Sequence, residues 1–293
     1  MADSDKYLFH QRKEPFRLSL MRTSQLSGFR PELIEKDYYC SLILMRIYAN
    51  KETPLVFKGG TCLSKCHTEF FRMSEDLDFM VPMSPGTPRS RRSNEMKGFK
   101  EIWKKEICIP PFSESIGLVG HNSSLQYIGE LTYESAVSEK PGVIKLEIGL
   151  REELVTPLEW KNARTVLMDS LTLSELIAPF PIKAFSLSEA YAEKMRAALT
   201  RKEPAIRDYF DLDYADRALK FSFYDDGFLK LVRRKLSVPG NDPIDISDAK
   251  YDALRMQVDG ALKPVLRAQD FEMFKLDRIF KMVCVLGRQL LGA

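Results

Sequence analysis

The chain has 293 residues, of which 44% are hydrophobic and 29% are charged, a composition that excludes global disorder. This length suits one large domain or two modest ones whose cores need no disulfides. The 44 basic and 41 acidic residues leave a net charge of +3, so any nucleic-acid-binding surface has to be local. The five cysteines lack a zinc-binding spacing and no apolar run approaches membrane-spanning length, so we expect a soluble protein of the reducing cytoplasm.

The first half of the chain alternates between helical and strand patterns. Apolar spacing predicts a helix over residues 32–48, and a short apolar run predicts a buried strand at 55–57. A turn with two glycines follows, and the remaining predictions are a helix over 63–71, a strand over 77–81, a basic helix over 89–105, and strands over 126–137, 142–150 and 164–171.

The second half has a mainly helical pattern. Thr172 with Glu175, and Ser186 with Glu189, have the spacing of capping boxes, whose side chains bond unpaired amides at a helix start. The helical pattern is interrupted at Pro204, Gly227, 239–243 and Pro264. We therefore predict an α+β protein of two lobes, with a mixed α/β lobe over residues 1–170 and a helical lobe over residues 171–293.

The turn that follows the first predicted strand has the residues of a phosphate-binding loop. Gly59 and Gly60 lead into a helix, and glycine lets backbone amides approach a phosphate closely. Thr61 can add a hydroxyl at the helix start, and Lys65 can add an ammonium on its first turns. Taken alone, the same residues also fit an ordinary tight turn.

Asp76 and Asp78 lie two residues apart in the next predicted strand, so they share one face of it. At about 5 Å and an effective dielectric near 20, two such carboxylates repel by about 3 kcal/mol, unless a cation or solvent compensates. Mg²⁺ prefers carboxylate and phosphate oxygens, and a solvated strand end is the alternative. The order of strand, glycine turn, helix and Asp-x-Asp strand favours nucleotidyl transfer. Ser74 lies two residues before Asp76, where its hydroxyl can reach a phosphate or serve the structure only.

A third carboxylate is needed if two metal ions activate a hydroxyl and stabilise the leaving pyrophosphate. Glu147 is the candidate, on a predicted strand where it shares a face with Lys145. The alternative is an amphipathic edge strand that carries a surface ion pair.

The helical half contains a further cluster of charges. Lys194 and Arg201 are seven residues apart on one helix face, and Pro204 ends that helix. Asp208 and Asp211 lie three residues apart on the next helix. A solvated, charged helix face explains this pattern equally well when it is taken alone.

Together the motifs resemble the AbiEii/AbiGii toxin family of nucleotidyltransferases, which includes the mycobacterial MenT toxins and is similar to the polymerase-beta-like superfamily. The resemblance extends over about residues 32–215, with the second motif the most specific. The motifs are Gly59-Gly60-Thr61-x-Leu63-x-Lys65, Arg72-x-Ser74-x-Asp76-Leu77-Asp78, Lys145-Leu146-Glu147, and Glu193-Lys194 with Arg207-Asp208-x-x-Asp211.

The resemblance implies a nucleotidyltransferase-like mixed-sheet lobe joined to a helical C-terminal lobe, with Mg²⁺ and an NTP as requirements. It implies a cytoplasmic toxin, with a cognate antitoxin, that adds nucleotides to a tRNA 3′ end and so blocks translation. The implied catalytic residues are Asp76, Asp78, Lys194 and Asp208; the implied nucleotide-binding residues are Gly59, Gly60, Thr61, Lys65, Ser74 and Asp211; the implied metal ligands are Asp76, Asp78 and Glu147.

Two basic stretches are candidates for contacts with RNA phosphates. Residues 89–105 carry seven cations, including Arg91 and Arg92, and Arg233–Lys235 forms a second cluster. An ordinary solvated helix is the alternative for the first stretch. Two other functions remain open from the sequence: a kinase or protein-nucleotidylating enzyme with the same NTP site, and a catalytically inactive nucleotide-binding module.

Overall fold

The structure is a computed structural model that describes residues 8–292, and the chain forms two compact units. The first unit contains the residues up to Leu154 together with Leu158–Phe185, and the second contains Val155–Pro157 together with the residues from Ser186 onward. The chain therefore crosses between the units three times. The last crossing follows Phe185, later in the chain than the boundary at residue 170 that the sequence indicates.

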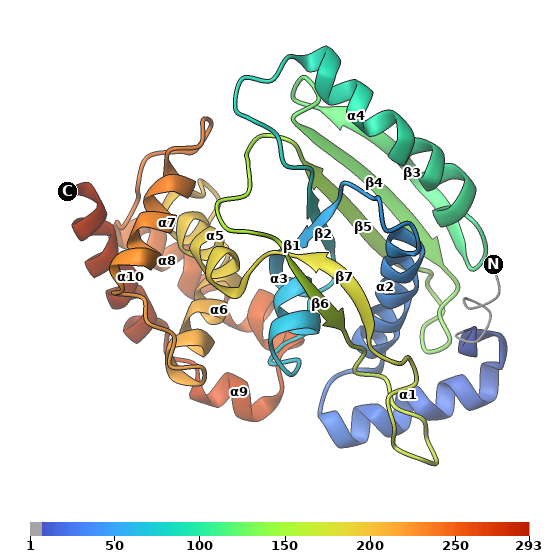
Figure 1. Cartoon of the computed structure of the whole chain (residues 1–293). Coiled ribbons are helices and arrows are strands. Elements are labelled where there is room, and N and C mark those ends of the chain that lie inside the picture. Colours follow the sequence, from blue (N-terminus) through green and yellow to red (C-terminus); the bar gives the residue numbers. More distant parts are fainter. Residues whose placement is uncertain (1–7, 293) are drawn as a thin grey trace. The chain divides into compact units, whose positions relative to one another are not determined.

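The first unit is built on a mixed sheet of seven strands with the order β3-β4-β5-β2-β1-β7-β6 (Figure 1). β2 is antiparallel to β1 and parallel to β5, so the centre of the sheet combines both kinds of pairing. The strands are β1 (Val56–Lys58), β2 (Leu77–Met80), β3 (Phe112–His121), β4 (Gln126–Tyr133), β5 (Gly142–Gly149), β6 (Glu159–Ala163) and β7 (Phe180–Ala184).

One face of this sheet is covered by helices, and the core lies between them and the strands. On α2, Tyr39 stacks on Tyr133 of β4 with ring centroids 3.9 Å apart, and beside α4 the Trp103 ring packs against Gly129 of the same strand. The helices of this unit are η2 (Phe9–Gln11), α1 (Lys13–Ser27), α2 (Pro31–Ala49), α3 (Gly59–Cys62), η3 (Leu63–His67), α4 (Arg89–Ile102) and η4 (Trp103–Ile107).

The opposite face of the sheet is only partly covered. Along β4, buried Tyr127, Gly129 and Leu131 alternate with half-buried residues such as Ile128, because successive side chains of a strand point to opposite faces. Glu147 of β5 stands opposite Ile128 and is also half-buried. This second face is therefore where polar side chains of the central strands reach solvent.

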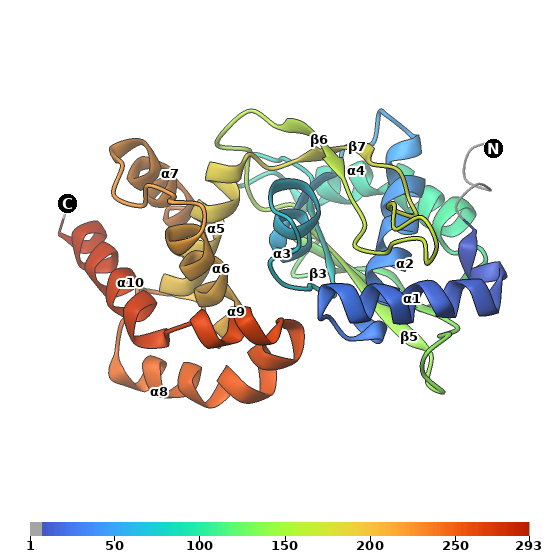
Figure 2. The ribbon, with the colours of Figure 1, turned by 90° about the horizontal axis from the view of Figure 1, so that it is seen from below.

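The described residues of the second unit form helices and connecting loops, with no strand among them (Figure 2). α10 carries an apolar stripe that buries Ile279, Val283 and Leu286 in this unit. The helices are α5 (Leu187–Thr200), α6 (Ile206–Arg217), α7 (Asp226–Leu236), α8 (Asp248–Gln257), η5 (Val258–Leu262), η6 (Lys263–Val265), α9 (Ala268–Met273) and α10 (Leu276–Leu291).

Most elements expected from local pattern are confirmed. α2, β1, β2, β4 and β5 form where the sequence predicts them, and the basic helix appears as α4 continued by η4. The helix expected over 63–71 ends at His67, because the amide and the hydroxyl of Thr68 both donate to the Leu63 carbonyl, at 3.0 and 2.9 Å.

Two predictions around the end of the first unit are wrong. Residues 164–171 form no regular strand, because Thr165 Oγ1 and the Val166 amide donate to the Asp37 carboxylate, at 2.9 and 3.0 Å. Thr172 begins no helix and instead donates its hydroxyl to Asp169 in a turn, at 3.1 Å. In addition, the strands β3, β6 and β7 form where no strand was expected from the sequence.

The second capping prediction is confirmed in half. Ser186 Oγ accepts the Glu189 amide of α5 at 3.1 Å, as a helix N-cap does. The Glu189 carboxylate does not reach back to the cap. It accepts the amides of Val155 and Thr156 instead, at 3.1 and 2.8 Å, and so holds the crossing segment against α5 within the second unit.

Candidate nucleotidyltransferase site

Three adjacent strands bring charged side chains into one row of the sheet. Asp78 of β2 stands opposite Lys58 of β1 on one side and opposite Glu147 of β5 on the other. Paired residues of neighbouring strands share a face, so Asp78 and Glu147 lie together on the partly exposed face of the sheet. The flanking pairs are buried on the other face: Leu77 with Leu146, and Phe79 with Ile148.

The first glycine of the turn lies directly against this row. Gly59 has a φ of +79°, and a Cβ there would stand 2.9 Å from the Asp78 Cβ and overlap its carboxylate. Both the left-handed backbone and the close approach therefore require glycine. The backbone of the turn consequently reaches the Asp78 carboxylate.

The second glycine is enclosed by the segment that leads into β2. A Cβ on Gly60 would stand 2.9 Å from Ser74 Oγ and still closer to the Arg72 guanidinium. Arg72 is almost fully buried, donates to the Met73 carbonyl at 2.9 Å, and has its own carbonyl bonded by Ser64 at 2.9 Å. Arg72 therefore supports the glycine turn, a role that its place in the second motif did not predict.

Thr61 connects the turn to the carboxylate segment. Its hydroxyl donates to the Asp76 carbonyl at 2.5 Å, and its side chain is buried. The glycine turn is thus fixed to the Asp-x-Asp segment by this hydrogen bond and by the close approach of Gly59, while Gly60 lies against the preceding Arg72 and Ser74. In this arrangement the Thr61 hydroxyl positions Asp76.

The carboxylates themselves differ in exposure. Asp76 is exposed just before β2, Asp78 is half-buried, and Glu147 lies 3.3 Å from Lys145 Nζ with both side chains more than a third exposed. Within residues 8–292, no three acidic, histidine or cysteine side chains are grouped as a ready-made metal cage. Mg²⁺ is commonly bound by one or two carboxylates plus substrate phosphates and waters, so this donor set fits an ion that arrives with the NTP.

The position of Lys65 corrects the phosphate-binding role expected from the sequence. Its ammonium is fully buried, forms an ion pair with Asp37 at 2.6 Å, and donates to Ser41 Oγ at 2.7 Å and to the Arg164 carbonyl at 3.2 Å. A lysine with all three protons directed into the protein fastens η3 to α2. We therefore assign it a structural role.

The charges of the second unit form a compact network. Lys194 Nζ contacts Asp208 at 2.7 Å and Asp211 at 2.8 Å, and Arg201 contacts the other oxygen of Asp208 at 3.0 Å. Asp208 and Asp211 are 6% and 0% exposed, so their charges depend on these cations. The structure brings these residues together in ion pairs, which excludes the solvated helix face as their description.

A buried ion pair that the sequence did not indicate lies in the same unit. Lys235 Nζ is 2.7 Å from Glu189, and both side chains are fully buried. Burial alone raises the pKa of Glu189, but the Lys235 charge and the amides of Val155 and Thr156 hold that pKa below its ordinary value. Lys235 is therefore not part of a basic surface, which corrects the expected cluster at Arg233–Lys235.

The expected basic surface on α4 needs a similar correction. Arg92 is 8% exposed and donates to the Thr87 carbonyl and, at 2.7 Å, to the Ser123 carbonyl. Arg92 therefore fixes the start of α4 to the β3–β4 hairpin. Arg91 is exposed and remains available.

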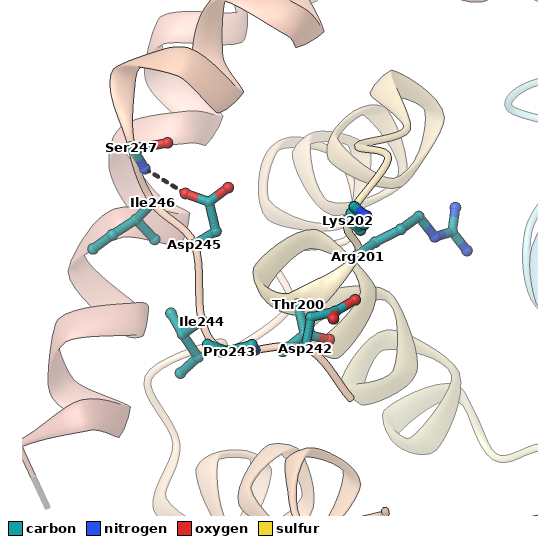
Figure 3. Close-up of a pocket in the computed structure, with 9 residues that line it drawn as sticks. All are labelled: Thr200, Arg201, Lys202, Asp242, Pro243, Ile244, Asp245, Ile246 and Ser247. Carbon is teal, nitrogen blue, oxygen red and sulfur yellow. Dashed lines mark hydrogen bonds between the residues drawn. The ribbon is translucent and has the colours of Figure 1, made fainter. Parts of the chain in front are cut away.

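A hollow of about 660 Å³ lies in the second unit, next to the end of α5 (Figure 3). Its lining mixes the cations Arg201 and Lys202 with the carboxylates of Asp242 and Asp245. The Asp245 carboxylate accepts a hydrogen bond from the Ser247 amide at 3.0 Å, which partly compensates its charge. The lining contains none of the nucleotide-binding, metal-binding or catalytic residues predicted from the sequence.

This architecture is that of a nucleotidyltransferase, an enzyme that moves a nucleoside monophosphate from an NTP. A profile of the family described as "Nucleotidyl transferase AbiEii toxin, Type IV TA system" matches residues 42–279. That match covers most of the chain, and the chain belongs to this family of toxin nucleotidyltransferases.

Among solved structures, two crystal structures from Helicobacter pylori match the chain, of which the first resembles the fold. One, described as a candidate nucleotidyltransferase, has a TM-score of 0.51 and 16% identity over 87% of this chain and 93% of its own. The other, JHP933, has a TM-score of 0.48 and 16% identity over 89% of this chain and 93% of its own. No protein of curated function matches the sequence. None of the described helices has the length and apolar character needed to cross a membrane.

Proposed function

We propose that the protein transfers a nucleoside monophosphate from an NTP to the 3′ hydroxyl of an RNA. The observation that carries the proposal is the contact of Gly59 with the Asp78 carboxylate, in the same row as Glu147. It joins a turn suited to a triphosphate with carboxylates suited to a metal ion. The family resemblance implies the tRNA acceptor end as the RNA, with a block of translation as the toxic effect.

In the proposed reaction the 3′ oxygen of the RNA attacks the α-phosphorus of the NTP. The new P–O bond forms as the bond from that phosphorus to the β-phosphate oxygen breaks, and pyrophosphate leaves. The proton of the hydroxyl passes to a carboxylate on this face of the sheet. Asp76, Asp78 and Glu147 would hold Mg²⁺, which would supply charge neutralisation and make the hydroxyl more acidic.

The remaining residues have supporting roles in this proposal. The amides of Gly59 and Gly60 bind the triphosphate, and Ser74, which lies against Gly60, contacts the same group. In the second unit, Lys194 and Asp208 are the catalytic residues that the family resemblance implies, and Asp208 and Asp211 fix the position of the Lys194 ammonium. The family also implies a cognate antitoxin. The proposal places the protein in the cytoplasm, where NTP and tRNA are present.

The test is the fate of a radioactive label. We would incubate the purified protein with Mg²⁺, tRNA and each NTP in turn, labelled either at the α- or at the γ-phosphate. The proposal predicts α-label at the RNA 3′ end and no γ-label in any macromolecule. Transfer of γ-label would instead identify a kinase, and α-label in protein would identify a protein-nucleotidylating enzyme. No transfer from any NTP would identify an inactive binding module.

A further inference from the structure

A group of apolar side chains is exposed on one side of the first unit. Leu18, Met21 and Leu26 belong to α1, and each of them is exposed to solvent. Leu171, which is 87% exposed, and Leu173 belong to a turn in the segment between β6 and β7. A single exposed leucine is ordinary on a protein surface, but a group of them marks a contact with another molecule.

The outer side of α1 combines these apolar residues with arginines. Leu18, Arg22 and Leu26 are four residues apart and form one row along the helix. Arg17 and Met21, also four residues apart, form the row beside it. All of them are exposed, whereas the opposite side of the helix is buried in the first unit. α1 therefore has a second apolar side, mixed with cations, that the fold does not use.

Hydrogen bonds hold the turn next to this side of α1. Ser19 Oγ accepts the Ser170 amide at 3.2 Å, and Thr23 Oγ1 accepts the Met168 amide at 3.0 Å. Ser19 lies three residues before Arg22, so the turn borders the row that contains this arginine. Figures 1 and 2 both show the segment between β6 and β7 alongside α1. The leucines of the turn therefore extend the apolar side of α1.

The turn that carries Leu171 and Leu173 is tightly organised. The Asp169 carboxylate accepts the amides of Leu171 and Thr172, at 2.9 and 2.8 Å, and the Asp169 carbonyl accepts the Leu173 amide at 3.0 Å. Leu173 has a φ of +57°, a left-handed conformation that glycine or asparagine adopts at a lower energetic cost than leucine. The turn therefore presents two apolar side chains to solvent at fixed positions.

The charge around these apolar side chains is positive. Arg12, Arg17, Arg22 and Arg30 are exposed, and none of them forms an ion pair with another residue in the range 8–292. Glu14 is the single acid of α1, and it lies in the first turn, where the helix dipole favours a negative charge. A partner for this surface therefore has to be both apolar and anionic.

An acidic protein and a membrane with anionic lipids both have this chemistry. A protein would need a pocket for the projecting Leu171 side chain together with a complementary surface for α1. A lipid surface needs neither, because acyl chains move apart around an inserted side chain while lipid phosphates bind arginines. Helices that mix leucines with cations along one side are typical of proteins held in the membrane interface. The projecting turn therefore favours the membrane.

We propose that this side of the first unit binds reversibly to a membrane surface that contains anionic lipids. α1 would lie along the surface with its arginines at the phosphates, and the tip of the turn would enter the acyl region. In the cytoplasm this surface is the inner leaflet of the membrane, which carries anionic lipids. The proposal is independent of the proposed nucleotide transfer. We call this surface the α1 patch, and it consists of Arg17, Leu18, Met21, Arg22, Leu26, Leu171 and Leu173.

Sedimentation with lipid vesicles measures this binding. The full-length protein would be mixed with vesicles of phosphatidylcholine alone, or of phosphatidylcholine with phosphatidylglycerol, and should sediment only with the second kind. Arg17→Gln/Arg22→Gln should lower the partition coefficient about thirtyfold, because two cations are lost at an anionic surface. Leu171→Ser/Leu173→Ser should lower it about tenfold, because less apolar area leaves water.

Matched control variants remove the same kinds of side chain from the second unit. Arg233→Gln/Arg234→Gln and Leu219→Ser/Leu291→Ser also change exposed residues, and they should leave the partition coefficient unchanged. Because every substituted side chain is exposed, all variants should fold. Circular dichroism and melting curves of each variant exclude unfolding as the cause of a loss.

A second measurement tests whether the turn enters the membrane. Leu171→Trp places a fluorophore at the tip of the turn, and lipids brominated in their acyl chains should quench its emission. The wild-type protein, which contains Trp103 and Trp160, is the reference for this assay. Quenching no stronger than in the wild type would contradict insertion.

The vesicle assay can overturn the proposal in several ways. Equal binding to neutral and anionic vesicles, an unchanged partition coefficient in either patch variant, or equal losses in the controls would each contradict it. If the wild-type protein fails to sediment with anionic vesicles even at low salt, where charge attraction is strongest, the membrane is not the partner. That result would assign the α1 patch to an acidic protein instead.

Discussion

Individual residues of the glycine turn provide the most discriminating test at the smallest scale. Gly59→Ala should abolish transfer, because the new Cβ would overlap the Asp78 carboxylate in a backbone with a φ of +79°. The positive φ by itself should cost about 1 kcal/mol of the free energy of unfolding. Initial rates of nucleotide transfer and urea unfolding curves measure the two effects separately.

Gly86 provides the matched control for that substitution. It has a φ of +85°, but a Cβ at this position would meet no other atom within 4 Å, so Gly86→Ala carries the backbone strain without the overlap. We expect the two variants to lose similar stability and only Gly59→Ala to lose transfer. Equal activity in the two variants would show that the approach of Gly59 to Asp78 has no part in catalysis.

Lys65 tests the distinction between a phosphate ligand and a structural ion pair. Lys65→Met leaves the Asp37 carboxylate, 4% exposed, without its cation, so the free energy of unfolding should fall by about 3–5 kcal/mol. The KM for NTP of the remaining folded protein should stay near the wild-type value. Urea unfolding and steady-state kinetics below the melting temperature measure both. A raised KM with unchanged stability would restore the phosphate-binding role expected from the sequence.

At the scale of elements, the crossing segment Val155–Pro157 depends on Glu189 and Lys235. Because the pKa of Glu189 is held below its ordinary value in the folded protein, its contribution to stability is complete above the unfolded pKa near 4.3. It is lost as the pH falls through the folded pKa. Glu189→Gln should therefore be less stable by about 3–5 kcal/mol at pH 7 and should show a weaker loss of stability between pH 5 and pH 3. Urea unfolding at several pH values checks this, and an unchanged acid slope would contradict it.

The elements also show what sequence patterns can and cannot reveal. β2, the glycine turn and the Ser186 cap depend on neighbours within a few residues, so their patterns are visible in the sequence. β3 was not predicted because it is an edge strand with mostly exposed residues, and so lacks the alternation of a half-buried strand. The segment after Ala163 was predicted as a strand from its apolar content. In the structure its hydrogen bonds go to Asp37, a distant residue that no local pattern connects to this segment.

The candidate site was predictable to the extent that its residues share a strand or a turn. Asp78 and Glu147 stand opposite each other because of the register of two parallel strands that are far apart in the sequence. The sequence suggested this pairing only through the residue types. The partner of Lys65 lies on α2, which no local spacing connects to η3, so the lysine was taken for a phosphate ligand. Arg72 was overlooked because a buried guanidinium packed on a glycine has no sequence signature.

For the whole molecule, the question is whether catalysis requires both compact units. Lys194→Ala should lower kcat more than it changes the KM for NTP, if the ammonium stabilises charge that develops in the transition state. Because the substitution also leaves Asp208 and Asp211 without their cation, stability has to be measured alongside the kinetics. Glu189→Gln is the control, since it weakens the same unit through different groups. Similar losses of activity in both variants would remove Lys194 from the reaction.

The central claim is that the Asp78 carboxylate, beside the glycine turn and opposite Glu147, is part of the centre that transfers nucleotides. The most direct measurement is the initial rate of α-label transfer to RNA by wild-type protein and by Asp78→Asn, with melting curves of both. The substitution keeps the size of the side chain and removes its charge and most of its affinity for a divalent cation. We predict a loss of at least about a hundredfold in rate with an unchanged or slightly raised melting temperature. A folded Asp78→Asn variant that transfers nucleotides at a near wild-type rate would contradict the account.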